Sequence, residues 1–374
     1  MRQKKCMKEK TIFISVIMTK FNFIKNLSLV FLLIGLLLVN SCSVSQTSLQ
    51  VLVPAEISVS QEIKHVGIIN RSLPAKRNKF VNILEGFISG ETIMGDHIGS
   101  EYCLRGLTET LNNSPRFSAV IIQGEGLKGT GTRTFPPPLS WERVVQICKK
   151  YRIDALISLE TFDSNIDIRI DKRMIKKKVK DKKTKEKIKI KVPRYYAKLY
   201  IDVNSGWKIY ESHNKYVVDA NVYSDRKIWN TVGDTKKESR RKLPLKREAI
   251  NLAGHFSGIQ YGTRISPTWI NVSRTYYTKG CPEFTEAFRY IKTGNWEEAV
   301  LIWKTVLENS DKKIAGRAAF NIAVAAEVRG DLQEAYRWAD SAYTRYGNKA
   351  AYRYIRTLSL RIEESKRLDE QLKE

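Results

Sequence analysis

Residues 140–162 read SWERVVQICKKYRIDALISLETF, and this stretch decides the fold class. After Ser140, the apolar side chains Val144 and Ile147 recur at helical spacing, which predicts an amphipathic helix with Ser140 as its N-cap. Residues 155–162 follow as a short apolar run of β-prone residues, which is typical of a buried strand. A helix that leads directly into a buried strand is half of a βαβ unit.

The flanking sequence on the N-terminal side supplies the other half of the unit. Residues 62–69 (EIKHVGII) and 117–122 (FSAVII) each predict a strand, and both are apolar. Between them, residues 100–112 place Leu104 and Leu107 on one helical face, and Ser100 is expected to cap that helix. Strands that alternate with helices at this spacing predict a largely parallel sheet.

Beyond residue 163 the pattern changes to short β-prone segments without helices between them. We expect strands at 165–171, 195–203, 208–210, 216–223 and 227–229, paired as antiparallel hairpins that extend the sheet. Pro244 then suits the first turn of a helix that ends near Phe256. The predicted N-terminal body, residues 55–275, is therefore an α/β (α+β) domain with a mixed sheet.

A basic segment interrupts this extension at residues 173–192, RMIKKKVKDKKTKEKIKIKV. Apolar residues alternate on both sides of the polar centre DKKTKE, which predicts two strands and a turn, hence one long basic β-hairpin. Two interpretations remain open: a solvated hairpin whose lysines prevent edge-to-edge aggregation, or a contact with an anionic surface. The candidate anionic contact consists of Lys176, Lys177, Lys178, Lys182, Lys183, Lys187 and Lys189.

The N-terminus predicts export. Residues 27–39 (LSLVFLLIGLLLV) are uncharged and too short to span a bilayer, and Lys20 and Lys25 precede them. The junction that follows, Val-Asn-Ser-Cys ending at Cys42, resembles a bacterial lipobox. The resemblance implies cleavage before Cys42 and its acylation, so that residues 1–41 are a lipoprotein signal peptide and 42–54 a tether. The alternatives are an ordinary cleaved signal or an N-terminal anchor helix.

The possible start site, the net charge and the cysteine content further limit the class of protein to which the chain can belong. Met18 offers an alternative start that gives a signal of more usual length. The chain has a net charge of +26; residues 1–41 hold seven basic residues and one acidic residue, so the remainder carries +20. In an exported protein such an excess favours anionic lipid or acidic polysaccharide over nucleic acid, and we expect no nucleic-acid partner. After Cys42, only Cys103, Cys148 and Cys281 remain, which excludes a disulfide-stapled scaffold.

Two similar segments mark the C-terminal region, residues 280–374. GNWEEA at 294–299 and GDLQEA at 330–335 align at an offset of 36 and resemble the turn of a tetratricopeptide repeat. Residues 349–372 are expected to form a capping helix. The alternative is a plain helical bundle without a groove. The predicted repeat-packing residues are Gly294, Trp296, Ala299, Trp303, Gly330, Leu332 and Ala335.

Candidate chemistry is sparse. Residues 124–129 spell GxGxxG after a predicted strand, but the three prolines at 136–138 exclude the helix that a dinucleotide site requires. Asp96, His97 and Glu101 crowd together, and we interpret them as turn or capping residues rather than a metal site. We expect no catalytic residue, no metal and no cofactor.

The segment that joins the two regions, residues 253–280, is dense in glycine and aromatic residues. We expect it to be an interdomain linker. The alternative is a groove lined by Tyr261, Trp269, Tyr276 and Tyr277.

Taken together, the lipobox, the strand–helix order and the repeated turn resemble an uncharacterised family of Bacteroidota lipoproteins, a domain of unknown function with a tetratricopeptide-like tail. The resemblance implies an envelope location and supplies no reaction. We expect a non-enzymatic scaffold that is held at a membrane by acylated Cys42 and binds a protein partner through its tail. The second hypothesis is a glycan- or anionic-lipid-binding lipoprotein. Ser43, in place of an aspartate, favours the outer membrane, on its periplasmic or its surface face.

Overall fold

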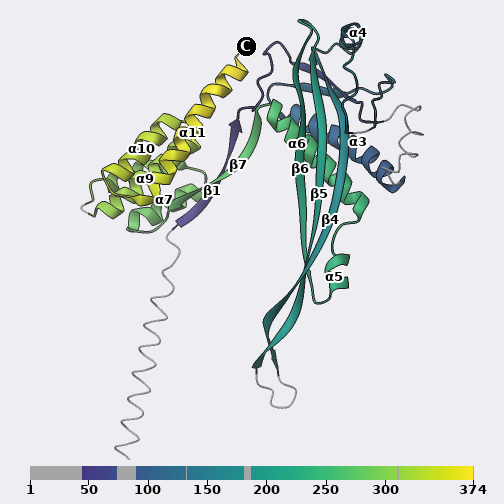
Figure 1. The fold of residues 1–374 in the computed structure, drawn as a ribbon. Coiled ribbons are helices and arrows are strands. Elements are labelled where there is room, and N and C mark those ends of the chain that lie inside the picture. The colour runs from purple at the N-terminus through teal and green to yellow at the C-terminus, as the bar shows by residue number, and fades with distance from the viewer. Residues whose placement is uncertain (1–43, 74–89, 132, 181–186, 310, 374) are drawn as a thin grey trace, which may run out of the picture. The chain divides into compact units, whose positions relative to one another are not determined.

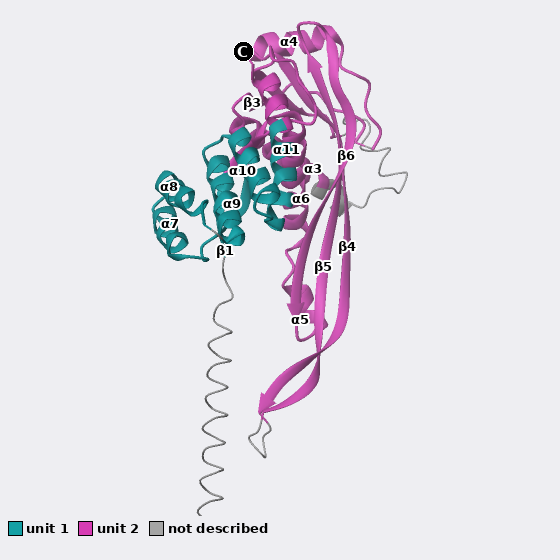
Figure 2. Cartoon of the chain, turned by 90° about the vertical axis from the view of Figure 1, so that its left-hand side faces the viewer, with its two compact units in different colours: residues 1–49, 271–362 teal, residues 50–270, 363–374 magenta. Residues whose placement is uncertain are grey.

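The computed structural model describes residues 44–73, 90–131, 133–180, 187–309 and 311–373 (Figure 1). The chain divides into two compact units, coloured separately in Figure 2. Unit 2 comprises residues 50–270 and 363–374, and unit 1 comprises residues 1–49 and 271–362. Among the described residues, no helix is both long enough and apolar enough to cross a membrane.

Unit 2 contains a five-stranded sheet in the order β3-β2-β4-β5-β6, and the prediction of a mixed sheet is confirmed. β2 pairs parallel with both β3 and β4, whereas β4–β5 and β5–β6 are antiparallel. The strands are β2 (His65–Asn70), β3 (Ser118–Ile121), β4 (Ala155–Lys180), β5 (Lys187–Glu211) and β6 (Tyr216–Gly233). The helices of this unit are α3 (Gly90–Asn113), α4 (Trp141–Tyr151), α5 (Lys236–Arg241) and α6 (Lys246–Ile265).

Helices cover the sheet on both faces. On one face α3 and α6 bury Leu104, Leu107 and Ala253 against alternate residues of β2, β4 and β5. On the other face α4 buries Val144 and Ile147 in a smaller cluster. The predicted N-cap of α4 is confirmed, because the Ser140 side chain accepts a hydrogen bond from the Arg143 N–H at 3.3 Å.

The expectation of short separate strands is wrong. β4 runs without a break for 26 residues, through the gap that we expected between residues 162 and 165. Its register against β5 shifts between Leu159 and Thr161, which leaves Glu160 as the extra residue of a β-bulge. The bulge reverses which residues face the helices, so one continuous strand has the sequence pattern of two.

The expected helix boundaries and the interdomain linker are also corrected. Ser100 does not cap a helix but lies fully buried inside α3, which begins ten residues earlier. The helix after Pro244 starts at Lys246 and continues to Ile265 instead of ending near Phe256. Residues 253–280 are therefore mostly regular structure, since α6 is followed by β7 (Thr268–Tyr277).

Glycines explain why these helices are hard to recognise. α3 and α6 cross so closely that a Cβ at Gly258 would lie 1.9 Å from the carbonyl oxygen of Cys103. A Cβ at Gly106 would lie 2.1 Å from the oxygen of His255, so the close approach is reciprocal. Glycine is a poor helix former in isolation, but here it permits backbone-to-backbone packing that any side chain would prevent.

Residues 44–53, which we expected within a tether, form strand β1 (Val44–Val53). This strand pairs with β7 in a two-stranded sheet. The segment VSQTSLQVLV alternates more exposed and less exposed side chains along most of its length, the pattern of a strand with one covered face.

Unit 1 carries the helical tail, and its all-helical character is confirmed. The tail consists of α7 (Pro282–Lys292), α8 (Trp296–Val306), α9 (Lys312–Val328), α10 (Leu332–Thr344) and α11 (Lys349–Leu372). α11 reaches beyond the unit boundary at Ile362. Two apolar clusters fill the tail; one is centred on Trp303 and the other on the alanines of α9 and α10.

Replacing Gly258 by alanine tests the helix crossing. An alanine stabilises an exposed helical site by up to about 1 kcal/mol relative to glycine. At Gly258 we expect the opposite, a loss of about 1–3 kcal/mol in the free energy of unfolding, because the new methyl group meets backbone. Urea unfolding followed by circular dichroism measures this difference. The control Leu252→Ala, at an exposed position of the same helix, should change stability by less than about 0.5 kcal/mol. Equal or higher stability of Gly258→Ala would contradict the proposed crossing.

Candidate functional site

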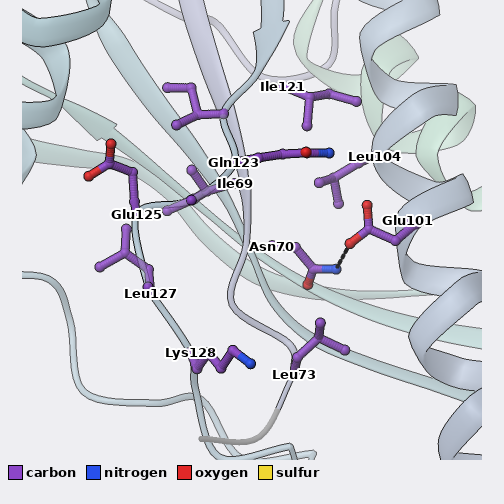
Figure 3. Close-up of a pocket in the computed structure, with 13 residues that line it drawn as sticks. Ile69, Asn70, Leu73, Glu101, Leu104, Ile121, Gln123, Glu125, Leu127 and Lys128 are labelled. Carbon is purple, nitrogen blue, oxygen red and sulfur yellow. Dashed lines mark hydrogen bonds between the residues drawn. The ribbon is translucent and has the colours of Figure 1, made fainter.

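A cavity of about 410 Å³ lies beside the carboxyl ends of the parallel strands β2 and β3 (Figure 3). Ligands in open α/β sheets commonly bind at this edge. Ile69 and Ile121 of the strands and Leu104 of α3 line its apolar part. Its polar side chains include Asn70, Gln123, Glu101 and Lys128.

Two of these polar side chains, Asn70 and Glu101, are engaged with each other. The Asn70 amide nitrogen donates to Ser100 Oγ at 2.9 Å and to Glu101 Oε1 at 3.0 Å. Its oxygen accepts from both the backbone N–H and the hydroxyl of Ser72. Asn70 therefore ties the end of β2 to α3, and its hydrogen-bonding groups already have partners within the protein.

The glycine-containing loop at residues 124–129 borders the same cavity but does not form a dinucleotide site. Gly124 and Gly126 have positive φ, and the next described helix, α4, begins only at Trp141. Glu125 points away from the cavity (Figure 3) and accepts hydrogen bonds from Arg143, Lys150 and Tyr151 at 2.7–2.8 Å. Those donors, Lys150 first, lower the pKa of Glu125. The loop is thus held to α4 by a carboxylate and presents no helix N-terminus to a phosphate.

The bulge in β4 creates a buried ion pair that the sequence did not reveal. Glu160 meets Arg71, the residue after β2, with both Glu160 oxygens 2.9–3.0 Å from Arg71 Nη1. Tyr210 donates to the same carboxylate at 3.1 Å, and Arg71 also donates to the carbonyl oxygen of Pro137. Burial raises the pKa of Glu160, against the opposing effect of Arg71. Because the Glu160 side chain is fully enclosed, this cluster joins β2, β4 and the loop before α4 and does not meet solvent.

Asp96, His97 and Glu101 all lie inside α3, so the expectation that they form a turn or cap a helix is wrong, and their side chains have different surroundings. Asp96 accepts a hydrogen bond from Ser164 of β4 at 2.5 Å, Glu101 serves Asn70, and His97 is exposed. Within the described ranges, no group of three His, Cys, Asp or Glu residues could hold a metal ion. Burial raises the pKa of Asp96 to about 6.

The four aromatic residues of the alternative interpretation, a groove, do not form a shared open surface. Tyr261, a residue of α6, is fully buried, and its ring stacks on Trp207 of β5 with centroids 4.5 Å apart. It also donates to Asp219 at 2.8 Å. Tyr276 is buried and Tyr277 is half-buried, whereas Trp269 is 52% exposed.

The basic residues singled out in the sequence lie on two antiparallel strand ends. β4 and β5 remain paired from Lys172 opposite Tyr195 out to Lys180 opposite Lys187. β6 ends at Gly233, opposite Tyr195, so beyond that point no described strand other than β4 pairs with β5. We call residues 173–180 and 187–194 the basic ribbon, which Figure 1 shows continuing past α5. The ribbon includes Lys176, Lys177, Lys178, Lys187 and Lys189, whereas Lys182 and Lys183 lie outside the described residues.

In the helical tail the two repeated segments adopt the same local structure. Gly294 and Gly330 have φ of 80° and 87°, a left-handed conformation that favours glycine. The next residues, Asn295 and Asp331, each cap the following helix through the side chain. Ala299, Trp303 and Ala335 are fully buried, and Trp296 and Leu332 pack against the clusters with part of their surface exposed.

A basic hollow of about 510 Å³ opens at the start of α9 and α11. It is lined by Lys312 and Lys313 of α9, by Lys349 of α11 and by the partly covered Arg317. Tyr277 supports Arg317, whose guanidinium lies 5.0 Å from the ring centroid. The Asn348 side chain holds the two helix starts together by donating to the carbonyl oxygen of Gly316 at 3.0 Å. None of the lining residues is acidic. No local sequence pattern indicates this site, because its cations come from two segments more than thirty residues apart.

Cys42, the predicted lipidation site, lies outside the described residues, as do the predicted signal peptide 1–41 and Met18.

The raised pKa of Asp96 predicts the pH dependence of stability. Its folded pKa, about 6, exceeds its ordinary value of 3.8, so the ionised form is disfavoured in the folded state. Stability is therefore unaffected by this group below about pH 4 and falls as the pH rises through 6. Because the group is not fully enclosed, we expect Asp96→Asn to be more stable than the wild type by only about 1–2 kcal/mol at pH 7.5, with no difference at pH 4. Thermal unfolding between pH 4 and pH 7.5 measures this difference in stability, and Asp171→Asn, at an exposed position, is the control. A pH-independent difference would contradict the assignment.

Comparison with known proteins gives two family matches and no function. Residues 285–360, within the helical tail, match a domain of unknown function (DUF6340). No curated protein matches the chain. Residues 63–277 match a second domain of unknown function (DUF8603), and this match contains the whole five-stranded sheet with the helices that cover it. Because it spans more than half of the chain, the protein belongs to the family DUF8603.

Proposed function

We propose that this protein is a non-enzymatic lipoprotein of the cell envelope that binds a protein partner through its helical tail. The lipobox-like junction at Cys42 supports the anchor. Acylation of this cysteine would hold the chain at a membrane, in our proposal the outer one, because two or more acyl chains give stable attachment. The described part of the chain would then act as a scaffold beside that membrane.

The tail, in this proposal, is a short tetratricopeptide-like array. α7 with α8 and α9 with α10 form two helical hairpins, and the turns within them share glycine conformation, cap position and buried alanine at an offset of 36 residues. α11 would serve as the terminal helix that such arrays require. Repeats of this kind present extended surfaces for binding rather than catalytic constellations.

The observation that carries the proposal is the basic hollow. Its three lysines and one arginine form no ion pair with any described residue, so their charge is available to a ligand. We therefore propose an acidic segment of a partner protein as the occupant of the hollow. The hollow is concave and tyrosine-lined, which suits an inserted segment better than a flat contact.

Charge reversal within the hollow tests this assignment. Lys312→Glu, Lys313→Glu and Lys349→Glu are expected to leave folding intact, because glutamate is favourable in the first turn of a helix. We expect the combined variant to weaken partner binding at least tenfold. The measurement is quantitative pull-down from envelope extracts, followed by titration of the recovered partner.

The matched control reverses three charges elsewhere on the tail: Lys292→Glu, Lys304→Glu and Arg337→Glu. It carries the same change in net charge and should retain the partner. If both variants lost the partner equally, net charge alone would explain the binding, which would contradict a specific site. If neither variant lost the partner, a partner site at the hollow would be contradicted as well.

Metabolic labelling with radioactive palmitate tests the anchor. We expect label in the wild-type chain and none in Cys42→Ala, because the thiol is the proposed point of acylation. Cys281→Ala, which removes a partly covered thiol of the helical tail, should label like the wild type. Equal labelling of Cys42→Ala and the wild type would overturn the lipoprotein assignment.

A further inference from the structure

The basic ribbon is a two-faced element, and its pairing register shows how the faces differ. Residues directly opposite each other on antiparallel strands point to the same side, and successive residues alternate sides. The register pairs Lys176 with Lys191, Lys178 with Lys189 and Lys180 with Lys187. These six lysines share one side, which we call the lysine face. Lys177, opposite Ile190, points to the other side, and Lys180 and Lys191 join the set that the sequence suggested.

The reverse side of the ribbon is mainly apolar. It pairs Ile175 with Val192 and Val179 with Ile188. Ile188 and Ile190 are 40% and 39% exposed, so these side chains meet solvent. We call this side the apolar face.

The faces are inverted relative to the rest of the sheet. In unit 2 proper, Ile166, Ile168 and Ile170 of β4 pack toward α3 and α6. Continuing in steps of two along the same side leads to the lysine face, while the solvent side of the sheet leads to the apolar face. No extension of the core explains hydrophobic residues on that side, so the apolar face calls for a different partner.

The lysines of the lysine face repel one another. Like charges placed directly opposite each other destabilise an antiparallel pair, and here three such pairs follow in succession. Residues 173–180 and 187–194 contain no Asp or Glu, and no described residue forms an ion pair with any of the six lysines. At the base of the ribbon the opposed pair Arg173 and Arg194 differs, because Arg194 pairs with Asp234. Within the described chain, no carboxylate therefore compensates the charge of the lysine face.

We propose that the basic ribbon binds the surface of an anionic lipid membrane. The apolar face would enter the boundary between headgroups and acyl chains, as the apolar side of an interfacial element does. Both strands of a two-stranded ribbon are edge strands, so every lysine stem can turn around an edge and bring its ammonium group to the headgroup phosphates. One lipid surface thus satisfies both faces of the ribbon.

The apolar face favours a membrane over a soluble polyanion. A soluble polysaccharide or polyphosphate would neutralise the lysine face equally well, but it offers nothing to Ile188 and Ile190. A membrane offers both an anionic surface and an apolar interior. The proposal concerns the ribbon alone and does not depend on acylation of Cys42 or on the helical tail.

Vesicle flotation tests the proposal with the chain from residue 42 onward, carrying Cys42→Ser so that no lipid is attached. We expect binding to vesicles that contain phosphatidylglycerol, much weaker binding to pure phosphatidylcholine, and a decrease with added salt. Each surface lysine contributes about fivefold to such binding. Lys178→Gln, Lys189→Gln and Lys191→Gln together should therefore reduce binding at least tenfold. Ile188→Thr with Ile190→Thr, which keeps the charge and the β propensity, should also reduce it at least threefold.

The matched control is Lys236→Gln, Lys237→Gln and Lys246→Gln, three exposed lysines of α5 and α6. It removes the same charge and should bind like the parent, and thermal unfolding confirms that all variants fold. Loss in the lysine variant without loss in the isoleucine variant, together with displacement by soluble polyphosphate, would identify a soluble polyanion as ligand and overturn the proposal. Unchanged vesicle binding in both variants would also overturn the proposal, and the lysines would then serve only to protect a strand edge from aggregation.

Discussion

The close crossing of α3 and α6 is the constraint on which the rest of unit 2 depends. Gly106 of α3 and Gly258 of α6 bring the two backbones into contact, so the helix pair forms one compact layer on the sheet. That layer buries the alternate residues of β2, β4 and β5 in the main apolar cluster. β4 and β5 run beyond the end of β6, and this remainder of the two strands is the basic ribbon.

The change in side-chain chemistry follows that boundary. Where helices cover the strands, isoleucines face inward and charged residues such as Asp167 and Arg169 face solvent. Past Lys172, the side that faced the helices carries mainly lysines, and the side that faced solvent carries mainly aliphatic residues. A strand that only prolonged the core would keep its pattern, and a strand that only protected an edge would not need an apolar side. The inversion is what makes the ribbon a candidate membrane contact.

The sequence predicted the elements whose signals are local. Ser140 and the face after it gave α4, the apolar runs gave β2 and β3, and the repeated glycine turns gave the helical hairpins. It failed where distant residues decide the outcome. The glycines of α3 and α6 resemble loop residues until the other helix is present, and the bulge at Glu160 hides the continuity of β4. The Arg71–Glu160 pair, the lysine face and the basic hollow each require a register or a contact that one segment does not contain.

Photo-cross-linking in intact cells is the sharpest test of whether the basic hollow of the tail receives an acidic protein segment. A photoreactive amino acid in place of Lys349 would report what lies in the hollow, and the same group in place of Lys304 of α8 is the reference. We expect a protein adduct from position 349 whose cross-linked peptide is rich in Asp and Glu, and none of that adduct from position 304. No adduct from position 349, or the same adduct from both positions, would contradict it.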